Sequence, residues 1–346
     1  MAPEPADRIL VVGPSWVGDM VMSQVLYQLL CDTRSSPVID VLAPAWSGPI
    51  LQRMPQVNRI IDMPVGHGSL QLGQRRALGR MLATERYSQA IVLPNSLKSA
   101  LVPFFAGIAQ RTGWRGEMRY GLLNDLRRLD PQALPLMIQR FAALGLSPQA
   151  QLPDSLPEPH LQIDPQHAQQ AREVFSLLPD TPILALCPGA EFGSAKRWPA
   201  LYYGQLAQVY LARGWQVVLY GSANDAPVCN EIKAQTANHE HCFNLAGKTS
   251  LAQAVDLLSL SAAVVSNDSG LMHIAAALQR PLLALYGPTS PDFTPPLSAA
   301  SRRISSDIDC APCFARECPL GHHRCLREMT PERVLQALDA LLAELR

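Results

Sequence analysis

The chain has 346 residues, of which 48% are apolar and 17% are charged, a composition typical of a globular protein with a sizeable core and not of a disordered chain. At roughly 150 residues per domain, this length predicts about two domains. The 29 basic residues balance the 29 acidic ones, which gives no support to a bulk nucleic-acid binder, and no apolar run reaches the roughly 18 residues of a transmembrane helix.

The first half of the chain alternates short apolar strands with helical segments. This alternation is typical of a parallel sheet that helices cover on both faces. In chain order, the sequence predicts a strand at Ile9–Gly13, a helix from Asp19 to about Leu30, and further strands at Val38–Leu42, Ile60–Met63 and Ala90–Leu93.

A proline-rich stretch follows. Five prolines fall between positions 148 and 165, and prolines at this spacing interrupt both helices and strands. We therefore place a linker there and predict one domain at 1–155 and a second at 156–346.

The second half repeats the α/β alternation, so the fold class is α/β with two Rossmann-like parallel-sheet domains, expected to face a central cleft. In such folds ligands bind at the carboxyl ends of strands and in the cleft. The predicted helices are 166–178, 202–213, 251–259, 271–278 and 331–345, and the predicted strands are 182–187, 216–220, 263–266 and 282–286.

The loop after the first strand, 13–19, presents one acidic residue at the start of a helix. Its G-x4-G spacing lacks the Lys and Ser/Thr of a P-loop, because Asp19 and Met20 stand there, and it is not the G-x-G-x-x-G of dinucleotide-binding proteins. Two interpretations of Asp19 stay open, a helix N-cap and a general base.

A second loop, 187–199, combines small residues with Lys196 and Arg197 after a strand. Small residues let the backbone approach a ligand closely, and a neighbouring cation suits a phosphate. Pro199 can open the next helix. We favour a phosphate site here over a solvated pair of charges.

A third loop, 266–273, ends a strand and begins a helix at Gly270. Amides at a helix start bind anions, and His273 one turn further on suits a pyrophosphate, although Asp268 or Ser269 could instead cap the helix. Asp225, which follows Gly221-Ser222 after another strand, is a candidate for ribose hydroxyls.

Together these loops resemble the ADP-heptose–lipopolysaccharide heptosyltransferases, which are family 9 glycosyltransferases of the GT-B fold. The segments that carry the resemblance run through both predicted domains. They are GPSWVGDMVMSQ (13–24), LPNSLKSALVPFFAGIAQRTGWRGEMRYGLLND (93–125), CPGAEFGSAKRWP (187–199), SNDSGLMHIAAAL (266–278) and LYGPTSPDFTPPL (285–297).

The resemblance implies an inverting, metal-independent transfer of L-glycero-D-manno-heptose from ADP-heptose to the first heptose of the inner core on Kdo-lipid A, a step of lipopolysaccharide core biosynthesis. The domain 1–155 would bind the acceptor and the domain 156–346 would bind ADP-heptose, with the terminal helix able to pack back toward the first domain. The expected location is the cytoplasm, peripheral to the inner membrane. Glu4 and Asp7, where a signal peptide carries positive charge, agree with this.

The resemblance also implies roles residue by residue. Asp19 matches the general base that takes the proton of the acceptor hydroxyl. The positions that match donor-binding residues are Lys196 on the phosphates, Asp225 on the ribose, Thr249, Asp268, Ser269, Gly270 and His273.

Basic residues outnumber acidic ones ten to three between 72 and 128. They form either solvated helix faces or a surface for an anionic acceptor or membrane. The candidates for meeting Kdo carboxylates and phosphates are Lys98, Arg111, Arg115 and Arg119. Phe104 and Phe105 either touch the bilayer interface or belong to the core.

Four of the eight cysteines form a C-x2-C-x4-C-x6-C pattern, Cys310, Cys313, Cys318 and Cys325. Two interpretations stay open. One is a structural zinc site, in a protein whose catalysis needs no metal, and the other is a set of reduced or redox-labile thiols.

Two other functions also stay open. A non-catalytic protein that binds a sugar nucleotide or core oligosaccharide would give Asp19 no chemical role. A sugar-nucleotide epimerase on a similar scaffold would leave the basic region 72–128 unexplained.

Overall fold

A computed structural model describes residues 7–66 and 68–345, and it divides the chain into two compact units between Pro159 and His160. Residues 148–164 form neither helix nor strand. The division therefore falls inside the predicted linker, slightly beyond the predicted domain boundary at 155.

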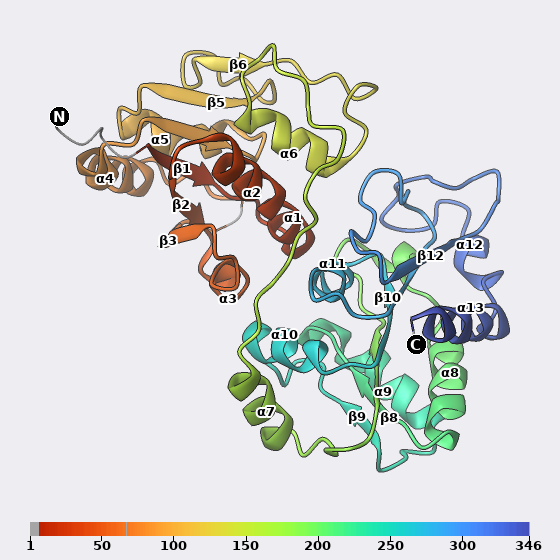
Figure 1. Ribbon diagram of the computed structural model, residues 1–346. Coiled ribbons are helices and arrows are strands. Elements are labelled where there is room, and N and C mark those ends of the chain that lie inside the picture. Colours follow the sequence, from red (N-terminus) through yellow and green to blue (C-terminus); the bar gives the residue numbers. More distant parts are fainter. Residues whose placement is uncertain (1–6, 67, 346) are drawn as a thin grey trace. The chain divides into compact units, whose positions relative to one another are not determined.

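The first unit contains a six-stranded, all-parallel sheet in the order β3-β2-β1-β4-β5-β6 (Figure 1). Its strands are β1 (Arg8–Val12), β2 (Val38–Ala43), β3 (Val57–Asp62), β4 (Gln89–Val92), β5 (Gln110–Trp114) and β6 (Asp125–Arg127). Its helices are α1 (Val17–Met22), α2 (Gln24–Thr33), α3 (Gly48–Leu51), α4 (Leu72–Leu82), α5 (Leu101–Phe105) and α6 (Met137–Gly145), with short 3-10 turns at Ala45–Ser47, Ala83–Glu85 and Leu97–Ala100.

Alternate residues of β1 face the two helix layers of this sheet. Leu10 and Val12 pack with Leu78 and Leu82 of α4, whereas Ile9 and Val11 are buried on the opposite face. Because both faces are covered, the strand is a continuous apolar run, which is why it can be recognised from the sequence.

The helix predicted from Asp19 to about Leu30 is in fact two helices, α1 and α2, that meet at Ser23. The Ser23 hydroxyl donates to the Met20 carbonyl oxygen at 2.7 Å and lies 3.0 Å from the Tyr27 hydroxyl. A serine bonded back to its own helix in this way bends or interrupts the helix, and periodicity alone does not report it.

The second unit contains another all-parallel six-stranded sheet, in the order β12-β11-β10-β7-β8-β9 (Figure 1). Its strands are β7 (Ile183–Cys187), β8 (Gln216–Leu219), β9 (Cys242–Asn244), β10 (Ala263–Asn267), β11 (Leu282–Tyr286) and β12 (Ser301–Ser305). Its helices are α7 (Pro165–Val174), α8 (Ala200–Ala212), α9 (Ala226–Gln235), α10 (Leu251–Ser259), α11 (Gly270–Ala277), α12 (Arg324–Arg327) and α13 (Pro331–Glu344), with 3-10 turns at Ser194–Lys196 and Ala223–Asp225.

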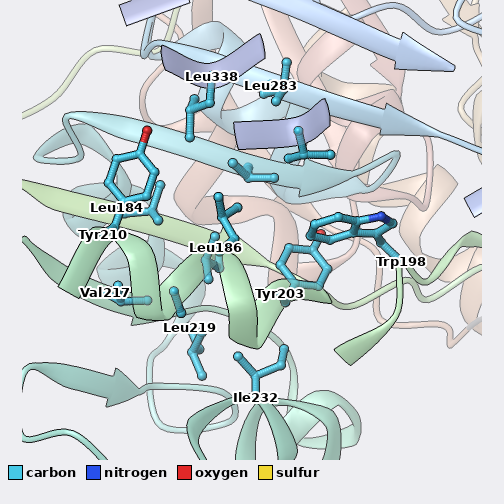
Figure 2. Packing of buried hydrophobic residues seen from close by; sticks show 14 of the residues in the cluster. Leu184, Leu186, Trp198, Tyr203, Tyr210, Val217, Leu219, Ile232, Leu283 and Leu338 are labelled. Atoms are coloured by element: carbon cyan, nitrogen blue, oxygen red, sulfur yellow. The ribbon is translucent and has the colours of Figure 1, made fainter. Parts of the chain in front are cut away.

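The core of the second unit lies between this sheet and the layer of α8, α9 and α13. Figure 2 shows Leu184 and Leu186 of β7 in this core together with Trp198 and Tyr203. The rings of Trp198 and Tyr203 meet edge to face, with 4.8 Å between their centroids. Trp198 has no exposed surface and donates its indole N–H to the Met329 carbonyl oxygen at 2.8 Å. This core anchors the loop that precedes α8.

The terminal helix α13 buries Val334 and Leu338 in this same core and packs against α8, β11 and β12 of its own unit. The sequence leaves open that this helix packs back toward the first domain. Its amphipathic face packs within the second unit.

Among the described residues, no helix combines the length and the apolarity needed to cross a membrane.

Candidate functional site

The candidate donor loops leave neighbouring strands at one edge of the second sheet. In the parallel pair of β7 and β10, Cys187 lies opposite Ser266, so the segments that follow both strands emerge side by side. The carboxyl edge of a parallel sheet is where α/β proteins bind ligands.

Lys196 and Asp268 form an ion pair at this edge. The Lys196 Nζ lies 2.6 Å from the Asp268 Oδ2, with the two side chains 13% and 6% exposed. Thr289 donates its hydroxyl to the same carboxylate oxygen at 2.7 Å. The pair therefore fixes one cation, nearly desolvated, beside the start of α11. Both charged residues are predicted here from the sequence, but Thr289 is not.

Asn267 ties the two loops together. Its Oδ1 accepts the Trp198 backbone N–H at 3.2 Å and the Tyr203 hydroxyl at 3.0 Å, and its Nδ2 donates to the Pro188 carbonyl oxygen at 2.7 Å. The side chain is fully buried. A buried amide with these partners is costly to displace. It therefore holds the loop 187–199, where the sequence predicts a phosphate site, against β10.

The helix α11 begins at Gly270, with Ser269 as its N-cap residue. Ser269 makes no side-chain cap hydrogen bond, and its hydroxyl lies 3.2 Å from that of Ser266. Asp268 directs one carboxylate oxygen to Lys196. The interpretation in which Ser269 caps this helix through its side chain is therefore not supported, and the amides of the first turn remain suited to an anion.

His273 lies one turn into α11 and is 5% exposed. Burial lowers its pKa to about 4, although the nearby Asp268 carboxylate acts in the opposite direction. The imidazole is therefore neutral at neutral pH, and it adds no charge to the site.

Asp225 is packed tightly between two glycines. A Cβ on Gly189 would lie 2.5 Å from the Asp225 carboxyl carbon, and one on Gly221 would lie 2.6 Å from the Asp225 Cβ. The Asp225 Oδ2 accepts from the Ser222 N–H and hydroxyl at 3.0 and 2.8 Å, while its Oδ1 lies 3.4 Å from Arg197. Oδ1 retains capacity for another donor.

Thr249 is half-buried in the turn between β9 and α10. The turn approaches the Asp225 loop, because the Gly247 N–H donates to the Gly221 carbonyl oxygen at 3.0 Å. Gly247 has φ +72° and leaves no room for a side chain, since its Cβ would lie 2.8 Å from the Ala223 Cα. Thr249 and Asp225 therefore stand on adjoining turns.

Asp19 lies in the first turn of α1 in the first unit and is half-buried. The N-cap residue of α1 is Trp16. The interpretation of Asp19 as a helix N-cap is therefore wrong. An acidic side chain in the first turn still gains from the helix dipole, and this gain does not exclude a chemical role.

The four candidate acceptor residues are placed differently. Arg115 is exposed and stacks on the Tyr120 ring at 6.0 Å, and Lys98 is half-buried. Arg111 is half-buried and donates to the carbonyl oxygens of Leu122 and Ile108 at 2.7 and 2.5 Å.

Arg119 departs from the expectation of an acceptor-binding side chain. It has no exposed surface, and its guanidinium donates to the carbonyl oxygens of Pro94 and Trp114 at 2.6 and 2.5 Å. Burial lowers its pKa to about 10, so it remains charged at neutral pH. It supports the neighbouring loops from inside instead of facing solvent. An arginine in a basic stretch carries no sequence signal that separates these two uses.

In the described part of the chain, no group of three or more His, Cys, Asp or Glu side chains is arranged to bind a metal ion. This finding gives no support to the structural zinc interpretation of the four cysteines.

Comparison with known proteins identifies the family to which this chain belongs. The sequence profile described as "Glycosyltransferase family 9 (heptosyltransferase)" matches residues 75–324. The chain is 54% identical to lipopolysaccharide heptosyltransferase 2 of Escherichia coli K12, over 97% of this chain and 99% of the relative, and 49% identical to lipooligosaccharide heptosyltransferase 2 of Haemophilus influenzae, over 97% and 100%.

The solved structure of E. coli ADP-heptose lipopolysaccharide heptosyltransferase II aligns with a TM-score of 0.88 at 51% identity, over 97% of this chain and 99% of that one. The two-sheet α/β fold predicted from the sequence is thereby confirmed. Full-length transferase relatives also displace the binding-protein and epimerase alternatives. The chain belongs to glycosyltransferase family 9, the heptosyltransferases, and is a glycosyltransferase.

Proposed function

We propose that this protein transfers L-glycero-D-manno-heptose from ADP-heptose to the first heptose of the lipopolysaccharide inner core, with inversion and without a metal ion. The observation that carries the proposal is the Lys196–Asp268 pair at the carboxyl edge of β7 and β10, beside the start of α11. Relatives of about half identity over the full length are named for heptose transfer to lipopolysaccharide.

The donor diphosphate is assigned to Lys196, with Arg197 beside it, and to the first amides of α11 at Ser269 and Gly270. When the bond to heptose breaks, negative charge grows on the diphosphate, and these groups meet it in a nearly dry setting. Asp268 is acceptor-only as a carboxylate, so it suits heptose hydroxyls and positions Lys196.

The nucleoside is assigned to the adjoining turns that carry Asp225 and Thr249. The Asp225 Oδ1 accepts from a ribose hydroxyl, which is the usual partner of a carboxylate at this edge of such folds. Neutral His273 is assigned to the same donor region, where it offers a hydrogen bond without opposing the charge of Lys196.

Asp19 is assigned as the general base. The acceptor oxygen attacks the anomeric carbon as its proton passes to the Asp19 carboxylate, and the bond from that carbon to the diphosphate oxygen breaks. A single displacement inverts the anomeric centre. ADP leaves without needing a proton, because a phosphate oxygen is a good leaving group.

The anionic acceptor is assigned to the surface of Arg115 and Lys98, with the half-buried Arg111 beside it. The carboxylates of Kdo suit a guanidinium, which can bind them through two parallel hydrogen bonds. Arg119 is left out of this surface and positions its loops.

We also propose a peripheral contact of the first unit with the inner membrane. Leu72, Arg76, Arg80 and Met81 are exposed on α4, and Phe104 is exposed on the neighbouring α5. Apolar side chains beside arginines favour an anionic interface. Arg76→Glu with Arg80→Glu should weaken sedimentation with anionic vesicles, and equal sedimentation would remove this contact from the proposal.

The transfer itself is tested by ADP release from ADP-heptose with heptosyl-Kdo2-lipid A as acceptor and excess EDTA present. We expect acceptor-dependent release in the wild type. Asp19→Asn, which keeps the shape of the side chain but not its basicity, should lose about 10² to 10⁴ in kcat. It should bind ADP as the wild type does.

Release that EDTA abolishes and Mg²⁺ restores would refute the metal-independent step. An Asp19→Asn variant with full turnover would remove Asp19 as the base. Equal turnover with an acceptor that lacks the first heptose would refute the assigned acceptor.

A further inference from the structure

The segment between β12 and α12, residues 306–323, forms neither helix nor strand and packs against the loop 187–199. The Ala195 N–H donates to the Arg316 carbonyl oxygen at 3.0 Å. A Cβ on Gly193 would collide with that same oxygen, so the two backbones are in direct contact. Arg316 is therefore held through its backbone beside the loop in which the sequence predicts a phosphate site.

The Arg316 side chain shares an aromatic ring with Lys196. The Arg316 guanidinium lies 5.4 Å from the centroid of the Phe192 ring, and the Lys196 Nζ lies 4.9 Å from the same centroid. Both cations are within the range of a cation–π contact, and they lie within about 10 Å of each other. Arg316 is exposed, so its guanidinium stays accessible to a ligand.

The cations at this edge of the sheet differ in whether a carboxylate balances their charge. Lys196 is paired with Asp268, and Arg197 is paired with Asp225. Within the part of the chain that the structure describes, Arg316 has the Phe192 ring as its side-chain contact and forms no ion pair. A guanidinium in this state is suited to a phosphate, which it can bind through two parallel hydrogen bonds.

The loop 187–199 also gives these cations an order. Gly189 packs on the Asp225 carboxyl group, to which the ribose is assigned, and Arg197 lies at this same end. Gly193, four residues further along, packs instead on Arg316. A nucleotide with its ribose at Asp225 therefore places its α-phosphate nearer to Arg197 and its β-phosphate nearer to Arg316.

We propose that Arg316 is a further donor-binding residue, and that its guanidinium binds the β-phosphate of the nucleoside diphosphate. The inference rests on the proposed function, because the direction of the nucleotide follows from the ribose assigned to Asp225. In the donor, the β-phosphate carries the sugar. Negative charge grows on this phosphate as the bond to the sugar breaks, so a guanidinium there stabilises the leaving group.

The experiment measures the Kd of ADP and of AMP by calorimetry for the full-length wild type and for Arg316→Met. We expect the Kd of ADP to rise about tenfold, as for the loss of a hydrogen bond to a charged group. The Kd of AMP should change less than twofold, because AMP has no β-phosphate. Arg316→Lys keeps the positive charge without the planar fork, and should keep an intermediate preference for ADP over AMP.

Arg213→Met is the matched control. Arg213 is also an exposed arginine of the second unit, and its guanidinium lies 4.9 Å from the centroid of the Tyr210 ring. It follows α8 and precedes β8, so it lies at the amino edge of the sheet, away from the proposed donor site. This variant should bind ADP and AMP as the wild type does.

Turnover gives a second measurement. In the ADP-release assay, Arg316→Met should lower kcat at saturating ADP-heptose, because the charge on the leaving diphosphate loses one of its cations. An unchanged Kd for ADP in Arg316→Met would overturn the proposal. So would a parallel rise in the Kd of ADP and of AMP, because a residue that only supports the loop 187–199 affects both nucleotides alike. Failure of the wild type to bind ADP would instead contradict the proposed function.

Discussion

At the scale of single residues, the donor site depends on a glycine that no sequence pattern singles out. Gly189 follows β7, and a Cβ there would meet all three terminal atoms of the Asp225 carboxyl group at 2.5 to 2.7 Å. Asp225 cannot easily retreat, because Ser222 and Arg197 contact its two oxygens and Gly221 lies behind it. Because Gly189 has no side chain, it leaves the space that the Asp225 carboxyl group occupies.

We therefore expect Gly189→Ala to displace the Asp225 carboxylate and to raise the Kd for ADP severalfold. Calorimetric titration with ADP measures the effect. Gly73→Ala on α4 is the matched control, because nothing lies within 4 Å of its added Cβ. If Gly189→Ala binds ADP as tightly as the control does, Asp225 is not a ribose ligand.

His273 makes the stability of the protein depend on pH in a defined window. Its pKa is about 4 in the folded protein, against 6.5 for an unperturbed histidine, mainly because burial disfavours the charged form. Between these values the unfolded chain binds more protons than the folded one. The free energy of unfolding therefore falls as pH drops from about 6.5 toward 4, and is unaffected by His273 above that window.

This linkage predicts that His273→Gln flattens the acid side of the stability profile. Between pH 7 and pH 5 the wild type should lose about 2 kcal/mol more than the variant, from the two pKa values and about 1.4 kcal/mol per unit. Equilibrium unfolding in urea at both values checks it. Parallel losses in the two proteins would show that His273 is not buried in its neutral form.

At the scale of elements, Arg119 and Arg115 form a natural pair for comparison, because they lie four residues apart after β5 and differ in burial. Arg119 joins the loop after β4 to the end of β5 through the Pro94 and Trp114 carbonyl oxygens and also contacts the Asn95 side chain at 3.2 Å. Arg115 points its guanidinium over Tyr120 at the surface.

Arg119→Met should lower the free energy of unfolding by about 2 to 4 kcal/mol, since it leaves buried carbonyl oxygens without a donor. Arg115→Met should change it by no more than about 0.5 kcal/mol and raise the KM for the acceptor. Urea unfolding and acceptor titration separate the two effects. An Arg119→Met protein of wild-type stability would contradict the supporting role.

Most of the strands that can be recognised from the sequence are buried on both faces, although the edge strand β3 is also predicted in part. The strands predicted at 263–266 and 282–286 are β10 and β11, which have neighbours on both sides, are buried along their whole length and begin with apolar residues. β9 (Cys242–Asn244) and β12 (Ser301–Ser305) lie at the two edges of the same sheet, are short or polar, and carry no such pattern. They could not be separated from loops.

The residues of the candidate donor site also fall into two groups, those that the sequence predicts and those that only the structure shows. Lys196 is a candidate from the sequence because it follows a strand in a loop of small residues, and Asp268 is a candidate because it matches the family's loop at the start of a helix. Thr289 and Asn267 could not, because each gains its role only when β10, β11 and α8 are packed and its hydrogen bonds form. Asn267 reads as an ordinary polar strand end until Trp198 and Pro188 are placed beside it.

At the scale of the whole molecule, the two units have separate sheets and separate apolar cores. The proposed donor residues all belong to the second unit, and the proposed base belongs to the first. This division means that nucleotide binding and proton transfer can be lost independently, each by a substitution in its own unit.

Hydrogen exchange on the full-length protein tests this division. ADP should slow exchange in the segments that end β7, β8 and β10, namely 187–199, 221–225 and 266–273, because a bound ligand stabilises the amides it orders. Lys196→Ala should abolish that protection, because the diphosphate loses its fixed cation, and Asp19→Asn should keep it while losing turnover. Protection by ADP confined to the loop 13–19 would place the nucleotide in the first unit and reverse the proposed assignment of donor and acceptor.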